Sequence, residues 1–124
     1  MLMLRPTCPV DYRLCDRTVT LYHFNATDKT YTTNIIRNAY FERKHIRNTD
    51  KLGGKDADTF LLIVPGSAVS ISVGDKVLVG EGAEISTREE WAALNPATVP
   101  DLVVVKWIDP KYWRGAVVHT EAGG

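Results

Sequence analysis

The chain is 124 residues long and 44% hydrophobic, a size and composition suited to one packed domain. Lys and Arg total 15 and so do Asp and Glu, which excludes the overall basic excess of a dedicated DNA-binding protein and the acidic excess of a disordered tail. The balance hides an asymmetry, because residues 29–55 hold seven cations and two anions while the rest of the chain holds eight cations and 13 anions. The sequence therefore predicts a molecule with two oppositely charged sides.

The first 16 residues contain Pro6 and Pro9 and show no hydrophobic period, so residues 1–16 are predicted to form an irregular N-terminal arm. Their apolar start is too short for a signal-peptide core, and no later apolar run has the length of a membrane span. We expect a protein that is not secreted, stays in the cytoplasm, makes no membrane contact and keeps Cys8 and Cys15 as free thiols.

The next segment predicts a β-hairpin. Residues 17–24 are rich in β-branched and aromatic side chains, the turn-prone residues 25–28 follow, and a second β-prone run occupies residues 31–41. This second run is long, so a bulge or bend near Asn34 or Asn38 is needed to keep its apolar side facing the core.

A polar stretch then separates this hairpin from the most apolar strand. Residues 43–56 are basic and contain a glycine pair, which predicts a long exposed loop. Residues 59–64 form a short continuous apolar run that ends at Pro65-Gly66, as expected of a buried strand. Residues 69–79 alternate apolar with small or polar side chains around a Gly74-Asp75 turn signal, which indicates another hairpin.

One helix start is clearly marked. Thr87 and Glu90 have the spacing of a capping box, and the negative charge of Glu90 suits the positive end of a helix dipole. Pro96 then stops the helix, so a short helix is predicted near residues 88–94.

The C-terminal part returns to β-structure. Residues 102–108 are strongly β-prone, residues 109–115 are predicted to be a turn or loop, and residues 116–121 a closing strand. Several short strands and one short helix predict a mostly β fold in a single domain, residues 17–124. We favour a small closed or partly open β-barrel, with a β-sandwich as the alternative.

Catalytic and metal-binding patterns are missing from the sequence. His23 alternates with apolar residues and is interpreted as a half-buried strand histidine whose ring nitrogen has a partner; His119 receives the same interpretation and His45 is assigned to the basic loop. Cysteines and histidines are scattered singly, without the paired spacing of a zinc site. We therefore predict a protein that is not an enzyme, with no catalytic residue, no metal site and no cofactor.

Two surfaces are candidates for interaction. The first is the basic segment, which could contact phosphates or an acidic neighbour and whose alternative interpretation is a solvated loop. Its cations are Arg43, Lys44, Arg47, Lys51 and Lys55. The second surface is aromatic, because large aromatic side chains are enriched at the centres of protein interfaces. It comprises Trp107, Tyr112 and Trp113, although core packing is an equal alternative for Trp107.

The second half of the chain resembles a known group of proteins. The segments that carry the resemblance are 59–65, 73–80 and 103–109, together with Arg114-Gly115 and His119. In these segments the chain is similar to small minor-capsid or head–tail connector proteins of tailed bacteriophages and prophages. The resemblance covers roughly Thr18 to the C-terminus, and the N-terminal arm lies outside it.

This resemblance implies a non-enzymatic virion structural protein, similar to the stopper or adaptor proteins that join head to tail. Such proteins look like small barrels whose loops or arms contact neighbouring subunits. The implied partners are portal, adaptor or tail components and further copies of the chain in a ring, with non-specific DNA contact through the basic segment. The implied location is the host cytoplasm during assembly and then the virion. The alternative function is a nucleic-acid-binding β-barrel that uses residues 43–55.

Overall fold

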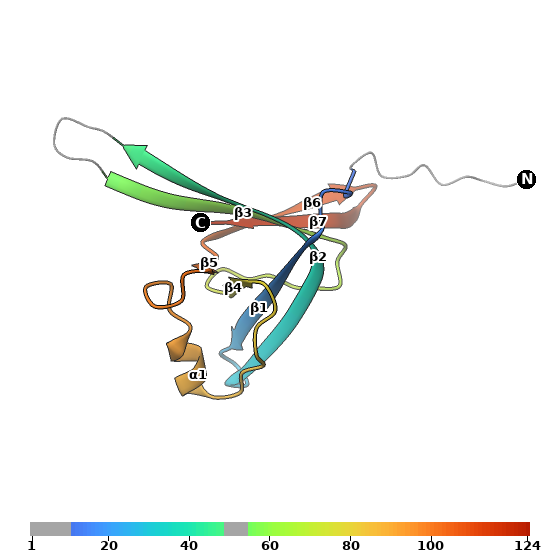
Figure 1. Ribbon diagram of the computed structural model, residues 1–124. Coiled ribbons are helices and arrows are strands. Elements are labelled where there is room, and N and C mark those ends of the chain that lie inside the picture. Colours follow the sequence, from blue (N-terminus) through green and yellow to red (C-terminus); the bar gives the residue numbers. More distant parts are fainter. Residues whose placement is uncertain (1–10, 49–54) are drawn as a thin grey trace, which may run out of the picture.

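A computed structural model describes residues 11–48 and 55–124, with the backbone alone for 45–48 and 55–58. The fold is mostly β, as predicted, and consists of one seven-stranded antiparallel sheet and one short helix (Figure 1). The strands are β1 (Arg17–Asn25), β2 (Thr30–Asn48), β3 (Lys55–Pro65), β4 (Lys76–Val79), β5 (Leu102–Val104), β6 (Trp107–Trp113) and β7 (Ala116–Gly123), and the helix is α1 (Arg88–Ala93). Their order across the sheet is β5-β4-β1-β2-β3-β7-β6.

Strand β2 belongs to both halves of the sheet. Strands β5, β4 and β1 lie on one side of it, and strands β3, β7 and β6 lie on the other. The first part of β2 pairs with β1 and its second part pairs with β3. Between these parts Arg17 lies opposite Ala39 while Val19 lies opposite Ile36, so β2 carries an extra residue and forms a bulge. The bulge lies beside Asn38, one of the two positions predicted. It bends the sheet, and the two halves curve toward each other as a half-barrel rather than a closed barrel (Figure 1).

The inner faces of both halves share one hydrophobic core. In each half the side chains alternate between core and solvent along the strands, as the pleat of a sheet requires. The buried members of the cluster are Val19, Leu21, Ile36, Ala39, Phe60, Leu62, Val64, Ile71, Val77, Val103, Val105 and Ala122. Since these residues come from β1 to β5, β7 and the connections between them, neither half has a separate core of its own.

The predicted loop at 43–56 is largely strand, which corrects the sequence prediction. Strand β2 continues to Asn48 and β3 begins at Lys55, and the two pair in register from Tyr40–Ile63 out to Asn48–Lys55. Polar composition marks this segment as exposed, but exposure does not prevent strand pairing. Residues 49–54 lie outside the described part of the chain.

The predicted hairpin at 69–79 is also wrong in its first half, because only Lys76–Val79 is a strand. The segment before it is held by a side chain instead of a ladder: the Asp75 carboxylate accepts a hydrogen bond from the Ser72 backbone N–H at 2.8 Å. The turn signal itself is genuine, since Gly74 has a φ of 95°.

Strand boundaries near the C-terminus differ from the prediction. The 102–108 run is broken between β5 and β6, because the chain crosses there from one half of the sheet to the other. At this crossing Val105 N–H bonds to the Asp75 carbonyl at 2.9 Å and Lys106 N–H to the Gly123 carbonyl at 2.8 Å. The predicted 109–115 turn shrinks to Arg114-Gly115, whose φ values of 51° and 78° are those of a type I′ hairpin turn.

Helix α1 confirms the helix prediction. Thr87 is its N-cap and accepts a hydrogen bond from the Glu90 backbone N–H at 3.2 Å. In the described part of the chain, no helix is long and apolar enough to span a lipid bilayer.

Part of the predicted N-terminal arm packs on the sheet. The Tyr12 hydroxyl lies 2.8 Å from His119 Nδ1 on β7, and Cys15 N–H bonds to the Tyr12 carbonyl at 2.9 Å. Cys15 is a free thiol, and burial raises its pKa. Residues 1–10, including Cys8, lie outside the described residues.

Candidate interaction site

The most prominent feature outside the core is a two-stranded extension of the sheet. We call residues 44–48 of β2 and 55–59 of β3 the ribbon. Strand β1 pairs with β2 only as far as Ala39, and β7 pairs with β3 only from Leu61 onward. Within the described chain the ribbon therefore has no third strand beside it, and it extends beyond the rest of the sheet (Figure 1).

The five predicted cations do not share one environment. Lys44 is exposed, with Nζ 3.8 Å from a Glu42 carboxylate oxygen, and the Arg43 guanidinium donates to the Pro100 carbonyl at 2.8 Å. The register places Arg47 opposite Asp56 and Lys55 opposite Asn48, while Lys51 lies outside the described residues.

The charge of this segment is also nearly balanced. Residues 42–58 contain the five cations together with Glu42, Asp50, Asp56 and Asp58. The register puts His45 opposite Asp58, as it puts Arg47 opposite Asp56. The basic excess seen in residues 29–55 is therefore smaller once the whole hairpin is considered.

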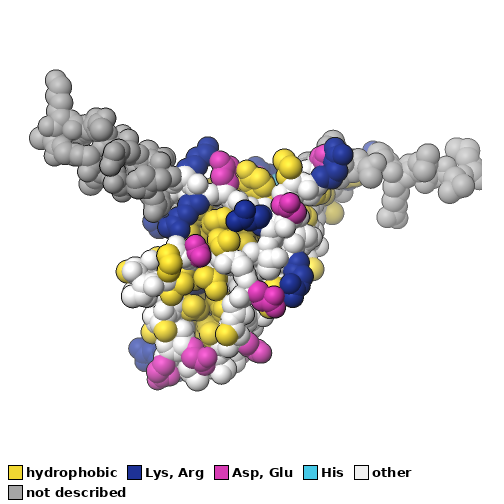
Figure 2. All heavy atoms as spheres, viewed as in Figure 1, with side chains coloured by type: hydrophobic (Ala, Val, Ile, Leu, Met, Phe, Trp, Pro, Cys, Tyr) yellow, Lys and Arg dark blue, Asp and Glu magenta, His cyan; other side chains and the backbone are white. Residues whose placement is uncertain are grey.

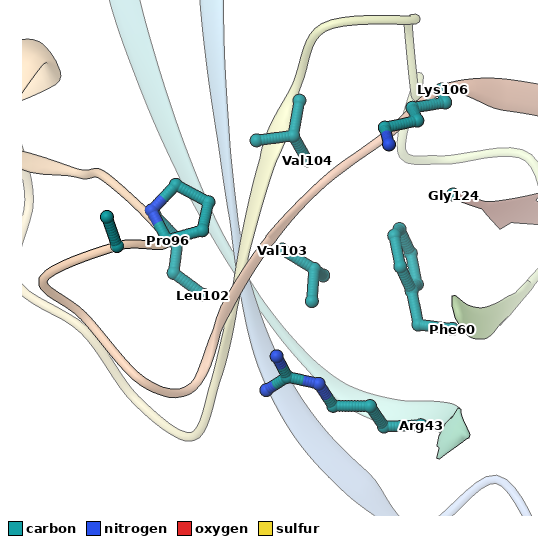
Figure 3. Close-up of a pocket in the computed structure, with 9 residues that line it drawn as sticks. Arg43, Phe60, Pro96, Leu102, Val103, Val104, Lys106 and Gly124 are labelled. Carbon is teal, nitrogen blue, oxygen red and sulfur yellow. The ribbon is translucent and has the colours of Figure 1, made fainter. Parts of the chain in front are cut away.

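A groove of about 400 Å³ lies at the base of the ribbon, where the half-barrel is open. Arg43 and Phe60 line one side of it, and Pro96, Leu102 and Val104 line the other (Figure 3). Figure 2 shows hydrophobic side chains on this face of the molecule, with Lys and Arg side chains beside them. The groove is thus an apolar surface edged by cations, and it lies next to the ribbon.

The three predicted interface aromatics lie in β6, an edge strand, and differ in their exposure and contacts. Trp107 is 45% exposed, and its ring lies against Gly123 so closely that a side chain at Gly123 would clash with it. Tyr112 is 65% exposed. Trp113 is half-buried with the Arg114 guanidinium 4.8 Å from its ring centroid. The three aromatic side chains therefore have different environments within the same edge strand.

The two histidines whose side chains are described, His23 and His119, have the partners expected of them. His23 Nδ1 lies 2.6 Å from the Asp75 carboxylate, and its side chain is 33% exposed. His119 is buried between Tyr12 and Glu121, with Nε2 3.6 Å from a Glu121 oxygen. Among the residues that the structure describes there is no group of three or more His, Cys, Asp or Glu side chains arranged to hold a metal ion.

A hollow that the sequence analysis did not identify lies at the far end of the molecule, between the β1–β2 hairpin and α1. Phe24, Tyr31 and Trp91 meet there, with ring centroids 4.9 to 6.2 Å apart. Each aromatic residue comes from a different element, so no local motif marks the cluster. The only signal available was the pair of aromatic residues on either side of the predicted 25–28 turn.

Comparison with known proteins and protein families identifies the family of this chain. No curated protein and no solved structure matches the chain. A family model described as a family of unknown function, DUF6751, matches residues 14–124. The match covers all seven strands and the helix, and it begins within the predicted N-terminal arm. The chain therefore belongs to the DUF6751 family of proteins of unknown function.

Proposed function

We propose that this protein is a non-enzymatic structural component of a bacteriophage or prophage virion, a minor capsid or head–tail connector protein of the stopper or adaptor kind. It acts through protein–protein contacts in a ring, with portal, adaptor or tail proteins as neighbours. It is present in the host cytoplasm during assembly and afterwards in the virion. The resemblance of the second half of the chain to such proteins suggests this role, and the ribbon is the observation that carries it.

The ribbon supports an assembly role because of its energetics. A two-stranded hairpin without a third strand or a packed face is marginally stable in water, and its outer edges leave backbone N–H and C=O groups unpaired. The described part of the ribbon has β2 and β3 alone. A neighbouring subunit that packs against the ribbon would supply the missing contacts.

The groove at the ribbon base supports the same role. It combines apolar side chains such as Phe60 and Val103 with the cations Arg43 and Lys106 (Figure 3). An apolar centre edged by charged groups is the usual make-up of a protein–protein interface. The ribbon and the groove would together contact adjacent subunits in a ring.

Nucleic-acid binding by residues 43–55 has less support. Arg43 is engaged with the Pro100 carbonyl, and the register sets Arg47 opposite Asp56. Phosphate binding depends on cations that neutralise phosphates, and nearby carboxylates oppose it.

A trimmed variant tests the proposal. Lys44 and Thr59 are Cα partners, so an Asn-Gly turn between them would replace residues 45–58 and close a shorter hairpin. Phe60 N–H bonds to Gly124 on the β7 side, which leaves the backbone groups of Thr59 facing β2 as such a turn requires.

The measurement is head–tail joining, counted in electron micrographs of particles from a phage whose copy of this gene is deleted. We expect unjoined heads and tails in the deletion, rescue by the wild-type chain, and no rescue by the folded trimmed variant. A matched control, Lys111→Gln on β6, should rescue. Normal joining without the protein would overturn the proposal, and full rescue by the trimmed variant would remove the ribbon from it.

A further inference from the structure

The aromatic hollow between the β1–β2 hairpin and α1 has the size and lining of a ligand site. Its volume is about 860 Å³, within the range of small-molecule pockets. Phe24, Tyr31 and Trp91 form a stepped wall whose planes are tilted by 34° to 43°. Phe24 is 37% exposed, so this wall is open to solvent.

Trp91 is held in place by a lysine. Lys76 Nζ donates hydrogen bonds to the Trp91 carbonyl at 2.7 Å and the Leu94 carbonyl at 2.6 Å, and it lies 4.4 Å from the centroid of the Trp91 ring. A cation over one face of an aromatic ring draws electron density toward that face. The ring therefore becomes less attractive to a second cation and more attractive to an anionic or electron-rich partner.

The charged residues that line the hollow have one sign. They are Lys29 in the β1–β2 turn and Arg88 at the start of α1, and both side chains are exposed. Neither has an ion pair within the described part of the chain. The nearby Glu90 carboxylate is occupied by Ser86 and Thr87, to which it is hydrogen-bonded, and it does not line the hollow.

These contacts narrow the class of ligand. A cationic ligand would meet repulsion from Lys29, Arg88 and Lys76, and a purely apolar one would gain nothing from the cations. A ligand that carries both a planar ring and a negative charge uses every part of the hollow. The ring stacks on the aromatic wall and the anion is attracted by the exposed cations.

We propose that this hollow binds a nucleoside phosphate, either as a free nucleotide or as one unit of a single-stranded nucleic acid. The base stacks on Tyr31 and Phe24 beside Trp91, and the phosphate lies between Lys29 and Arg88. The site is at the opposite end of the molecule from the ribbon (Figure 1), so it is independent of the proposed assembly role.

The test is a titration of the full chain with thymidine 5′-monophosphate and, separately, with a short oligo(dT). Two-dimensional NMR at low salt monitors the chemical shifts of the backbone amides. We expect shifts confined to the β1–β2 turn and α1. Arg88→Glu should weaken binding about tenfold, and so should Tyr31→Leu, which keeps an apolar side chain but removes the stacking face. Lys29→Asn should weaken it less, and Asn suits the positive φ of 54° at this position.

Lys44→Glu and Arg114→Glu are the matched controls, because each changes an exposed cation away from the hollow, and neither should alter binding. If the mononucleotide binds, the site takes free nucleotides; if only oligo(dT) binds, it takes a strand. No shifts with either ligand at millimolar concentration would overturn the proposal. Equal loss of binding in Lys44→Glu and Arg88→Glu would also overturn it. This experiment measures ligand binding and not head–tail joining. Failure of the nucleotide proposal can therefore be distinguished from failure of the proposed assembly role.

Discussion

Asp75 shows how one buried carboxylate organises a connection that has no ladder. The residue is 2% exposed. One carboxylate oxygen accepts a hydrogen bond from the Ser72 backbone N–H, and the other lies 2.6 Å from His23 Nδ1. The backbone carbonyl of Asp75 accepts a hydrogen bond from Val105 N–H. One residue therefore ties the β3–β4 connection to β1 and to the crossing between β5 and β6.

Removal of this carboxylate should be costly. In Asp75→Ala the Ser72 N–H and the His23 ring lose their partner, and hydrogen bonds to charged groups contribute about 1.5–3 kcal/mol each. We expect the free energy of unfolding, measured by urea titration, to fall by roughly 3 kcal/mol. Asp109→Ala removes an exposed carboxylate and should change it by less than about 0.5 kcal/mol. Equal stability of the two variants would show that the Asp75 contacts contribute nothing.

Glu90 gives the start of α1 a dependence on pH. Hydrogen bonds from the Ser86 backbone N–H, and then from the Thr87 hydroxyl, lower the pKa of Glu90 below its usual 4.5. A carboxyl whose pKa is lower in the folded state stabilises that state above the unfolded value, and this contribution is lost as the pH falls through the folded pKa.

We therefore expect amide exchange in α1 to accelerate as the pH falls below about 4.5, relative to its intrinsic rate. In Glu90→Gln this acceleration should be smaller. Glu84→Gln, which removes an exposed carboxylate outside α1, is the control and should keep the wild-type profile. Identical profiles for wild type and Glu90→Gln would contradict the capping role.

At the scale of elements, the two edge strands of the sheet and the ribbon differ in how they are protected against pairing with another chain. The edge strand β6 contains Pro110, which has no backbone N–H to offer a further strand, and β5 at the other edge is only three residues long. The described residues of the ribbon include no proline and are not short, and their protection comes from charged residues such as Lys44 and Lys55. Because charged residues leave the backbone edge of the ribbon free to pair, we propose that a partner contacts the ribbon rather than the sheet edges.

If the ribbon serves a partner and not the core, its removal should leave the fold intact. The trimmed variant, with Asn-Gly between Lys44 and Thr59, should unfold cooperatively with a free energy of unfolding within about 1 kcal/mol of wild type. Thermal unfolding followed by circular dichroism checks this. A loss of several kcal/mol would mean that the ribbon stabilises the half-barrel itself.

At the scale of the whole molecule, the shared core and the shared strand β2 make the two halves depend on each other. Leu62 on β3 is fully buried in a cluster that also contains Val19 and Val77 from the other half. A substitution that leaves a cavity at Leu62 should therefore destabilise both halves of the sheet.

Leu62→Ala should lower the free energy of unfolding by about 3 kcal/mol, because it removes apolar contacts and leaves a cavity. Amide exchange should accelerate by the same factor in β1 and β4 as in β3 and β7, since the halves unfold together. Leu14→Ala, at a side chain that is 76% exposed, should leave the free energy of unfolding and the amide exchange rates unchanged. Acceleration in β3 and β7 alone would show two independent folding units.

The sequence alone determined the features that depend on neighbouring residues. The spacing of Thr87 and Glu90 predicted α1, the β-branched runs predicted most strands, and the length of the second run predicted the bulge beside Asn38. Caps, turns and strand propensity act over a few residues, so they can be recognised without the fold.

Only the tertiary structure decided which distant segments meet. Strand pairing placed the described parts of the polar 43–56 segment in the ribbon, and it set Arg47 opposite Asp56. The fold also brought together Phe24, Tyr31 and Trp91, which belong to three elements. Such contacts depend on register and on the curvature of the sheet. The whole core sets both, and no local pattern in the chain records them.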